Sequence, residues 1–130
     1  VSSVWKDSRE VIQTNSNFGN AAVNFFVTNN FINEFVQQQQ ANIIVFPGFV
    51  ASDEHKVTTT LGRGGSDYTA AIIAAAVDAA SVEIWTDVSG MMTADPRWVP
   101  NAKIIPSISY QEAMELSHFG AKVIYPPTIQ

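Results

Sequence analysis

Residues 58–86 read TTTLGRGGSDYTAAIIAAAVDAASVEIWT, which joins a glycine-rich turn to an alanine-rich segment and then to a run of β-branched and aromatic residues. Alanine has the highest helix propensity, so the middle part predicts a helix from about residue 67 to residue 80. Ser66 is placed to cap this helix, and Asp67 suits its first turn by charge. Residues 82–86 predict a strand. A helix that leads into a strand is half of a βαβ unit and indicates an α/β fold.

The segments before this stretch continue the alternation of strands and helices. Residues 1–13 predict one or two strands, with Val11 and Ile12 as the buried positions. Apolar residues spaced three and four apart predict a helix over roughly residues 21–39. Residues 43–46 form a short apolar run that ends at a Pro-Gly pair, which is typical of a strand buried on both faces.

The segments after it are less regular. Residues 87–106 contain a glycine and three prolines and predict an irregular segment. Ser109 and Glu112 have the spacing of a capping box and predict the start of a helix that reaches about residue 119, so Glu112 is explained without a catalytic role. Gly120 is the expected C-cap, and residues 121–125 predict a last short strand.

Composition narrows the possible classes of protein. The chain has 130 residues, 46% hydrophobic and 15% charged, which is typical of one modest globular α/β domain. Seven Lys and Arg against twelve Asp and Glu give a formal charge of −5, and no basic run suggests a nucleic-acid partner. There are no cysteines, which excludes a disulfide framework and a Cys nucleophile. No apolar stretch is long enough for a membrane span and no signal-peptide pattern opens the chain, so a cytoplasmic protein is expected.

Three segments together resemble signatures of the aspartokinase family and follow one another in that family's order and spacing. They are residues 58–70 (TTTLGRGGSDYTA), 84–97 (IWTDVSGMMTADPR) and 109–123 (SYQEAMELSHFGAKV). Residues 47–49 (PGF) fit as well, and residues 7–9 look like the family's approach to its site. The third segment is most similar to forms that are fused to homoserine dehydrogenase.

This resemblance implies the amino-acid kinase, or carbamate kinase-like, fold, a three-layer αβα sandwich around a mostly parallel sheet. It also implies transfer of the γ-phosphoryl group of ATP to the side-chain carboxylate of L-aspartate, with Mg²⁺, at the first step of lysine, threonine and methionine biosynthesis. A homo-oligomer is expected. The family's N-terminal Lys-Phe-Gly-Gly motif and its C-terminal ACT domains have no counterpart here, so residues 1–130 are expected to be the C-terminal part of a kinase domain and to be inactive alone.

The glycine-rich turn supplies the expected aspartate site. Glycines let the backbone approach a ligand, a helix N-terminus favours anions, and an arginine can hold a carboxylate with two parallel hydrogen bonds. The resemblance assigns Arg63 to the α-carboxylate of aspartate, Ser66 and Phe49 to the pocket lining, and Asp67 to a catalytic role in orienting the substrate or the active-site cations. The acceptor carboxylate is already ionised at pH 7, so no general base is needed. On local pattern alone, a capped helix start with a solvated Arg63 is an equally good interpretation.

The expected nucleotide site begins where the strand over residues 82–86 ends. In open α/β sheets, ligands bind outside the carboxyl ends of the strands. The resemblance assigns five residues to the nucleotide: Thr86, Asp87, Met92, Arg97 and Lys122. Relatives often have Tyr where this chain has Met92, a departure that puts an aromatic contact to the nucleotide in doubt.

Two alternatives stay open. Glutamate 5-kinase, acetylglutamate kinase and uridylate kinase share a pattern similar to residues 86–96, so that segment alone does not decide the acceptor. Residues 61–68 and 119–122 favour aspartate. The third hypothesis is a non-catalytic binding remnant, which the absent phosphate motif supports for the isolated chain.

Overall fold

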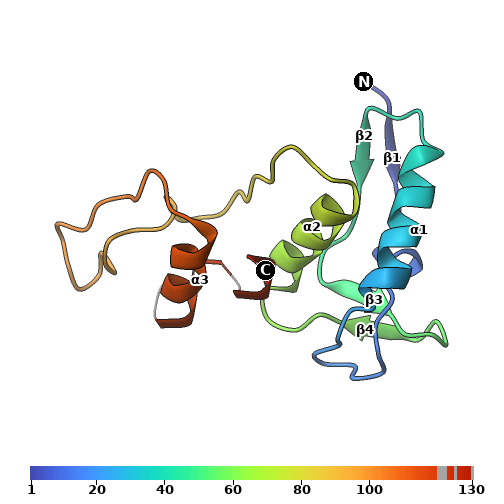
Figure 1. Cartoon of the computed structure of the whole chain (residues 1–130), viewed down its shortest axis with the longest axis horizontal. Coiled ribbons are helices and arrows are strands. Elements are labelled where there is room, and N and C mark those ends of the chain that lie inside the picture. The colour runs from blue at the N-terminus through green and yellow to red at the C-terminus, as the bar shows by residue number, and fades with distance from the viewer. Residues whose placement is uncertain (120–122, 125, 130) are drawn as a thin grey trace. The chain divides into compact units, whose positions relative to one another are not determined.

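The computed structural model describes residues 1–119, 123, 124 and 126–129 (Figure 1). The chain divides into two compact units, residues 1–82 and 83–130, each with its own internal packing. Among the described residues, no helix has the length and apolar character needed to cross a membrane.

The first unit contains two pairs of strands and two helices. Strand β1 (Ser3–Trp5) pairs in parallel with β2 (Ile43–Val45), and β3 (Val50–Ser52) pairs antiparallel with β4 (Thr58–Thr60). A short 3₁₀ helix, η1 (Ser8–Glu10), follows β1. Helices α1 (Phe25–Gln37) and α2 (Gly65–Ala76) contact each other, and both can be followed in Figure 1.

The core of this unit joins its helices to the β3–β4 hairpin. Its fully buried apolar residues are Val11, Ile12, Ile32, Ala51, Leu61 and Ile72. The predicted burial of Val11 and Ile12 is therefore confirmed. Ile32 comes from α1 and Ile72 from α2, so the apolar faces of both helices meet at one cluster.

Helix α1 begins four residues later than the periodicity predicted. Asn24 is its N-cap, and the Asn24 side chain accepts a hydrogen bond of 3.3 Å from the Val27 N–H. The residues before it are engaged elsewhere, because the Ala21 N–H donates to the Thr60 carbonyl and the Ala22 carbonyl accepts from Asn15. An apolar pattern alone does not show that these backbone groups have other partners.

The prediction that the strand over residues 43–46 is buried on both faces is wrong in this chain. Ile43 is 49% exposed and Val45 is 48% exposed. Strand β2 pairs only with β1 among the described residues, so side chains on one face of this pair remain uncovered.

The predicted capping role of Ser66 is also wrong. The N-cap of α2 is Gly64, which has a φ of 70° and makes no side-chain cap hydrogen bond. Ser66 already lies inside the first turn, because the left-handed Gly64 directs the chain into the helix earlier.

The second unit has less regular structure. The predicted strand over residues 82–86 does not form, since no other strand of the described residues pairs with it. The predicted capping box is confirmed: at the start of α3 (Tyr110–Phe119), the Ser109 N–H donates to Glu112 and the Glu112 N–H donates back to the Ser109 hydroxyl. A second 3₁₀ helix, η2 (Pro126–Thr128), follows.

Two residues of the predicted strand over residues 121–125 are among the described residues. Residues 123 and 124 lie in a turn and a bend. Gly120 and the other three residues of the predicted strand over residues 121–125 lie outside the described residues.

The β3–β4 hairpin depends on the ionised carboxylate of Asp53, which is 2% exposed. Burial opposes ionisation, but hydrogen bonds from the Val57 N–H, the Ser16 hydroxyl and the His55 N–H outweigh it, so the pKa of Asp53 lies below its usual value. A lowered folded pKa stabilises the protein above the unfolded pKa of about 3.9, and this contribution disappears as pH falls through the folded pKa.

Asp53→Asn is therefore expected to lower the free energy of unfolding at pH 7, with the difference from wild type shrinking as the pH falls below about 4. Denaturant titrations at several pH values measure it. Glu54→Gln is the matched control, because Glu54 is exposed and adjacent. If the loss of unfolding free energy caused by Asp53→Asn is the same at pH 7 and pH 3, the charge of Asp53 does not contribute to stability.

Candidate active site

The glycine-rich turn holds Arg63 at the surface just before α2. Gly62 and Gly64, on either side of Arg63, have φ values of 77° and 70°, which favour glycine. The Gly65 N–H donates to the Gly62 carbonyl at 3.1 Å and closes the turn. Arg63 is exposed, and within the described part of the chain its side chain makes no hydrogen bond or ion pair. Its guanidinium is therefore free to bind an anion beside a helix N-terminus.

The loop before β3 lies against this turn. A Cβ atom added to Gly48 would lie 2.9 Å from the Ser66 Cα, and one added to Gly65 would lie 3.0 Å from the Phe49 ring. Such distances leave no space for a side chain at either glycine. The two glycines thus allow the segment with Phe49 to contact the start of α2, where Ser66 lies.

Phe49 itself has an unusual backbone. Its φ is 77°, a left-handed conformation that is uncommon for a bulky residue, and its side chain is partly exposed. Its carbonyl accepts a hydrogen bond of 3.0 Å from the Leu61 N–H, and its N–H donates to the Thr69 hydroxyl at 3.0 Å. Conformations of this kind persist only where the surroundings fix them, and they cluster at functional sites.

The structure thus brings together the segments that carry the predicted aspartate residues, Phe49, Arg63, Ser66 and Asp67. Ser66 and Asp67 lie in the first turn of α2, and Arg63 directly precedes the N-cap residue Gly64. Asp67 is partly exposed, and in the part of the chain that the structure describes its carboxylate has no hydrogen-bond partner or ion-pair partner.

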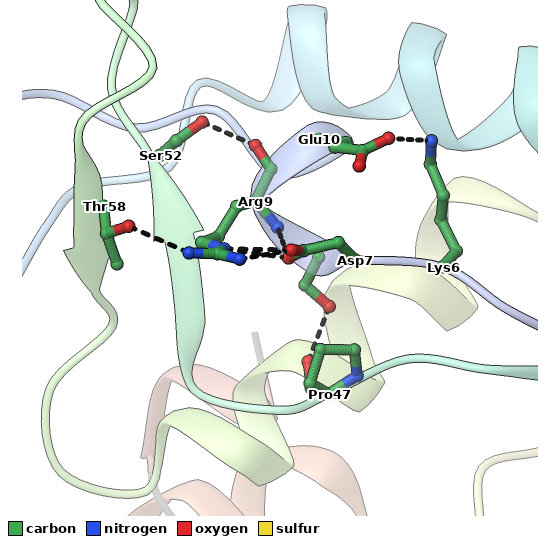
Figure 2. Close-up of polar contacts among 8 residues, drawn as sticks. Lys6, Asp7, Arg9, Glu10, Pro47, Ser52 and Thr58 are labelled. Atoms are coloured by element: carbon green, nitrogen blue, oxygen red, sulfur yellow. Dashed lines mark hydrogen bonds and ion pairs between the residues drawn. The ribbon is translucent and has the colours of Figure 1, made fainter.

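Residues of η1 contact the loop that carries Phe49 and the strand that follows it, β3 (Figure 2). The buried Ser8 hydroxyl donates to the Pro47 carbonyl at 2.5 Å, and the Ser52 hydroxyl donates to the Arg9 carbonyl at 2.5 Å. Figure 2 shows the Arg9 guanidinium between Asp7 and Thr58, to which it donates at 2.6 and 3.4 Å.

The Arg9 guanidinium hydrogen-bonds to Asp7 and holds the pKa of that carboxyl below its usual value. The sequence resemblance pointed to residues 7–9. In the structure, Asp7 and Arg9 pair with each other, and Ser8 contacts the start of the loop that carries Phe49.

Of the predicted nucleotide residues, the four that the structure describes lie in the second unit, which contains a cavity of about 1460 Å³. Small-molecule sites commonly measure about 300–1,000 Å³, so this space is wide enough for a nucleotide. Asp87, Met92 and Arg97 line the cavity. Thr86 does not line it, but the Thr86 hydroxyl donates to the Asp87 carboxylate at 3.1 Å. Lys122 lies outside the described residues.

Met92 is fixed in the cavity wall by backbone pairing. It forms an antiparallel bridge with Ile104, and hydrogen bonds from Ile105 to Met91 and from Thr93 to Lys103 flank that bridge. The irregular segment therefore holds Met92 in place even though the predicted strand before it does not form.

Arg97 is paired with a neighbour. Its guanidinium donates to the Asp95 carboxylate at 2.6, 3.0 and 3.1 Å, and these hydrogen bonds lower the pKa of Asp95. Both side chains are accessible to solvent, so the pair can open at little cost. Among the described residues that line the cavity, Arg97 is the one permanent cation, while Asp87, Asp95, Glu112 and Glu115 are acidic.

The described residues contain no group of three or more His, Cys, Asp or Glu side chains that could hold a metal ion.

The model of the amino acid kinase family matches residues 3–130. The chain therefore belongs to the amino acid kinase family. Within that family its similarity is to aspartokinases. It is 60% identical over 91 residues to the bifunctional aspartokinase/homoserine dehydrogenase of Buchnera aphidicola subsp. Acyrthosiphon pisum, covering 70% of this chain and 11% of the relative. It is 43% identical over 130 residues to lysine-sensitive aspartokinase 3 of Escherichia coli, covering 99% of this chain and 29% of the relative.

The solved structures agree. The crystal structure of E. coli aspartokinase III in complex with aspartate and ADP, in its R-state, matches with a TM-score of 0.91 and 44% identity, covering 99% of this chain and 29% of that one. The predicted fold class, the αβα sandwich of amino-acid kinases, is therefore confirmed. The chain spans less than a third of the length of these relatives.

Thr69 and Ser8 were not predicted as site residues. Both contact the loop at residues 47–49 through backbone groups. The family resemblance pointed to residues 7–9, but no local pattern shows the contact that Ser8 or Thr69 makes with this loop, which only the folded structure reveals.

Proposed function

We propose that residues 1–130 are the C-terminal part of the kinase domain of an aspartate kinase. The enzyme would transfer the γ-phosphoryl group of ATP to the β-carboxylate of L-aspartate and form 4-phospho-L-aspartate. The observation that carries this proposal is the guanidinium of Arg63, which has no partner among the described residues and lies in a glycine turn at a helix N-terminus, next to the strained Phe49 loop. The similarity to a structure with bound aspartate and ADP, over 99% of this chain, supports it.

In this proposal the first unit binds the amino acid. Arg63 holds the α-carboxylate through two parallel hydrogen bonds, which leaves the β-carboxylate free to attack. Phe49 and Ser66 line the pocket, and Asp67 orients the substrate or the cations. Since the attacking carboxylate is already ionised, the protein contributes position and charge rather than a general base.

The second unit binds the nucleotide through Thr86, Asp87, Met92, Arg97 and Lys122. Four acidic side chains are among the described residues that line its cavity, so ATP requires added positive charge there. Mg²⁺ supplies this charge when it binds with the phosphates, and Asp87 is the carboxylate that we assign to it. Arg97 turns from Asp95 to the phosphates.

Arg97→Ala is expected to raise the KM for ATP about tenfold, as for loss of one charge-assisted hydrogen-bonded contact, while the KM for aspartate changes little. Initial rates at varied ATP and at varied aspartate measure the two constants. Lys103→Ala is the matched control, because Lys103 is an exposed cation of the same unit that does not line the cavity. Equal effects of the two substitutions would mean that only overall charge matters and that Arg97 does not contact ATP.

The function is tested with the longer protein that contains this chain. It is mixed with ATP, Mg²⁺ and hydroxylamine, which traps acyl phosphates as hydroxamates, and supplied with aspartate, glutamate or N-acetylglutamate. Hydroxamate with aspartate alone is the expected result. Hydroxamate formed with another acceptor would mean that the substrate assignment is wrong, while the assignment of the fold would stand. The absence of hydroxamate with any acceptor would favour a non-catalytic binding protein. The isolated 130-residue chain is the comparison and is expected to release no ADP.

A homo-oligomer and a cytoplasmic location are further parts of this proposal, and so is a fusion to homoserine dehydrogenase. The relative from Buchnera aphidicola subsp. Acyrthosiphon pisum, which is named as such a fusion, supports the last of these. Light scattering of the longer protein would give its oligomeric state.

A further inference from the structure

We infer that Thr69 is a positioning residue for the amino-acid pocket, and that it acts by fixing Phe49 against helix α2. This inference rests on the proposed function of the pocket. Thr69 lies in the second turn of α2 and is 3% exposed. Its hydroxyl accepts a hydrogen bond of 3.0 Å from the Phe49 N–H and donates one of 2.8 Å to the Gly65 carbonyl. A hydroxyl has one proton to donate, so the donated bond to Gly65 leaves a lone pair for Phe49 and fixes its direction.

The position of Thr69 joins two walls of the pocket. Phe49 belongs to the loop before β3, whereas Gly65 is the first residue of α2 and directly follows the turn at residues 62–64 that carries Arg63. One buried side chain is therefore hydrogen-bonded both to the Phe49 loop and to the first residue of α2, next to the turn that carries Arg63. The distance between the aromatic wall and the arginine depends on this contact, and it is the distance that an amino-acid substrate would have to match.

The backbone of Phe49 explains why such a contact is needed. A φ of 77° is unfavourable for any residue with a Cβ atom, so an unsupported loop would relax to a negative φ. Both backbone polar groups of Phe49 are engaged, the carbonyl by Leu61 and the N–H by Thr69. Loss of the Thr69 hydroxyl removes one of these two anchors, and the ring is then free to leave its place.

The test compares Thr69→Val, which keeps the shape but removes the hydroxyl, with Thr69→Ser, which keeps the hydroxyl. In the longer protein, Thr69→Val is expected to raise the KM for aspartate about tenfold, with kcat and the KM for ATP within about twofold, because one positioning hydrogen bond is lost. Thr69→Ser is expected to restore the KM for aspartate to near the wild-type value.

The matched control is Thr28→Val. Thr28 is also a buried helical threonine and lies on α1. Its hydroxyl accepts a hydrogen bond from the Gln13 N–H and donates one to the Gln13 carbonyl. Its loss is expected to lower the unfolding midpoint and leave both KM values unchanged. A Thr69→Val enzyme that behaves in the same way, with a lower midpoint and an unchanged KM for aspartate, would reduce Thr69 to a structural residue and overturn the inference.

Amide hydrogen exchange of the peptide that contains Phe49 separates this inference from the proposed function. The Phe49 amide is expected to exchange at least about tenfold faster in Thr69→Val than in wild type, since its hydrogen-bond acceptor is gone. This readout needs no substrate. If the Phe49 amide exchanges faster in Thr69→Val but the protein forms no aspartyl phosphate, only the proposed function is overturned. If exchange of the Phe49 amide is unchanged, the anchoring role of Thr69 is overturned, even when the enzyme phosphorylates aspartate.

Discussion

Replacing Arg63 with alanine is expected to raise the KM for aspartate roughly 30-fold or more, equivalent to about 2 kcal/mol, because a hydrogen-bonded charge pair buried by substrate binding is broken. The KM for ATP is expected to stay within about threefold of the wild-type value, since Arg63 belongs to the amino-acid pocket in this account. Initial rates of the longer protein at varied aspartate and varied ATP give both constants. The free enzyme should lose little stability, because Arg63 is exposed and makes no ion pair in the described structure.

Arg63→Lys is the matched variant for this prediction. Lysine keeps the positive charge but cannot form two parallel hydrogen bonds to one carboxylate, so an intermediate KM for aspartate is expected. An aspartate dependence that neither substitution changes would remove Arg63 from the pocket.

Replacing Ile32 with alanine is expected to lower the free energy of unfolding by about 3 kcal/mol, because it leaves a cavity in a closely packed core. Ile32 is fully buried and joins α1 to the cluster that includes Leu61 and Ile72. Denaturant titration of the chain measures the change. Val57→Ala, at a position that is half exposed, is expected to change the free energy of unfolding by less than about 0.5 kcal/mol. Similar losses for the two variants would mean that this core does not hold the helices together.

The parts of the fold that local chemistry determines were predicted well from the sequence. Helical periodicity located α1, alanine-rich composition located α2, and the capping box of Ser109 and Glu112 located the start of α3. A helix cap and a helical face each involve residues that are only a few positions apart in the sequence. A local pattern is therefore sufficient to predict them.

The strands were harder to predict because a strand depends on its partners. Residues 82–86 have strand-forming side chains but no partner in the described chain, and β2 has a neighbour on one side only. The error at Ser66 has a different cause, which is local. The φ of Gly64 sets the first residue of α2, and Gly64 and Ser66 are both reasonable N-caps by residue type.

The candidate site shows the same division. Arg63, Ser66 and Asp67 follow one another closely in the sequence, so the motif that contains them was sufficient to predict them together. The contact between Phe49 and Thr69 joins residues that are 20 positions apart, and a threonine in an alanine-rich helix gives no sign of it. The ion pair of Arg97 with Asp95 was not predicted either, although the two residues are only two positions apart.

The position at which aspartate is phosphorylated tests the central claim most directly, because Arg63 is proposed to hold the α-carboxylate and leave the β-carboxylate free. The longer protein is incubated with ATP, Mg²⁺, aspartate and hydroxylamine, and the two possible hydroxamates are separated and identified by mass spectrometry. The account predicts aspartate β-hydroxamate alone. The α-hydroxamate, or no aspartyl hydroxamate at all from a folded protein that binds ATP, would contradict it.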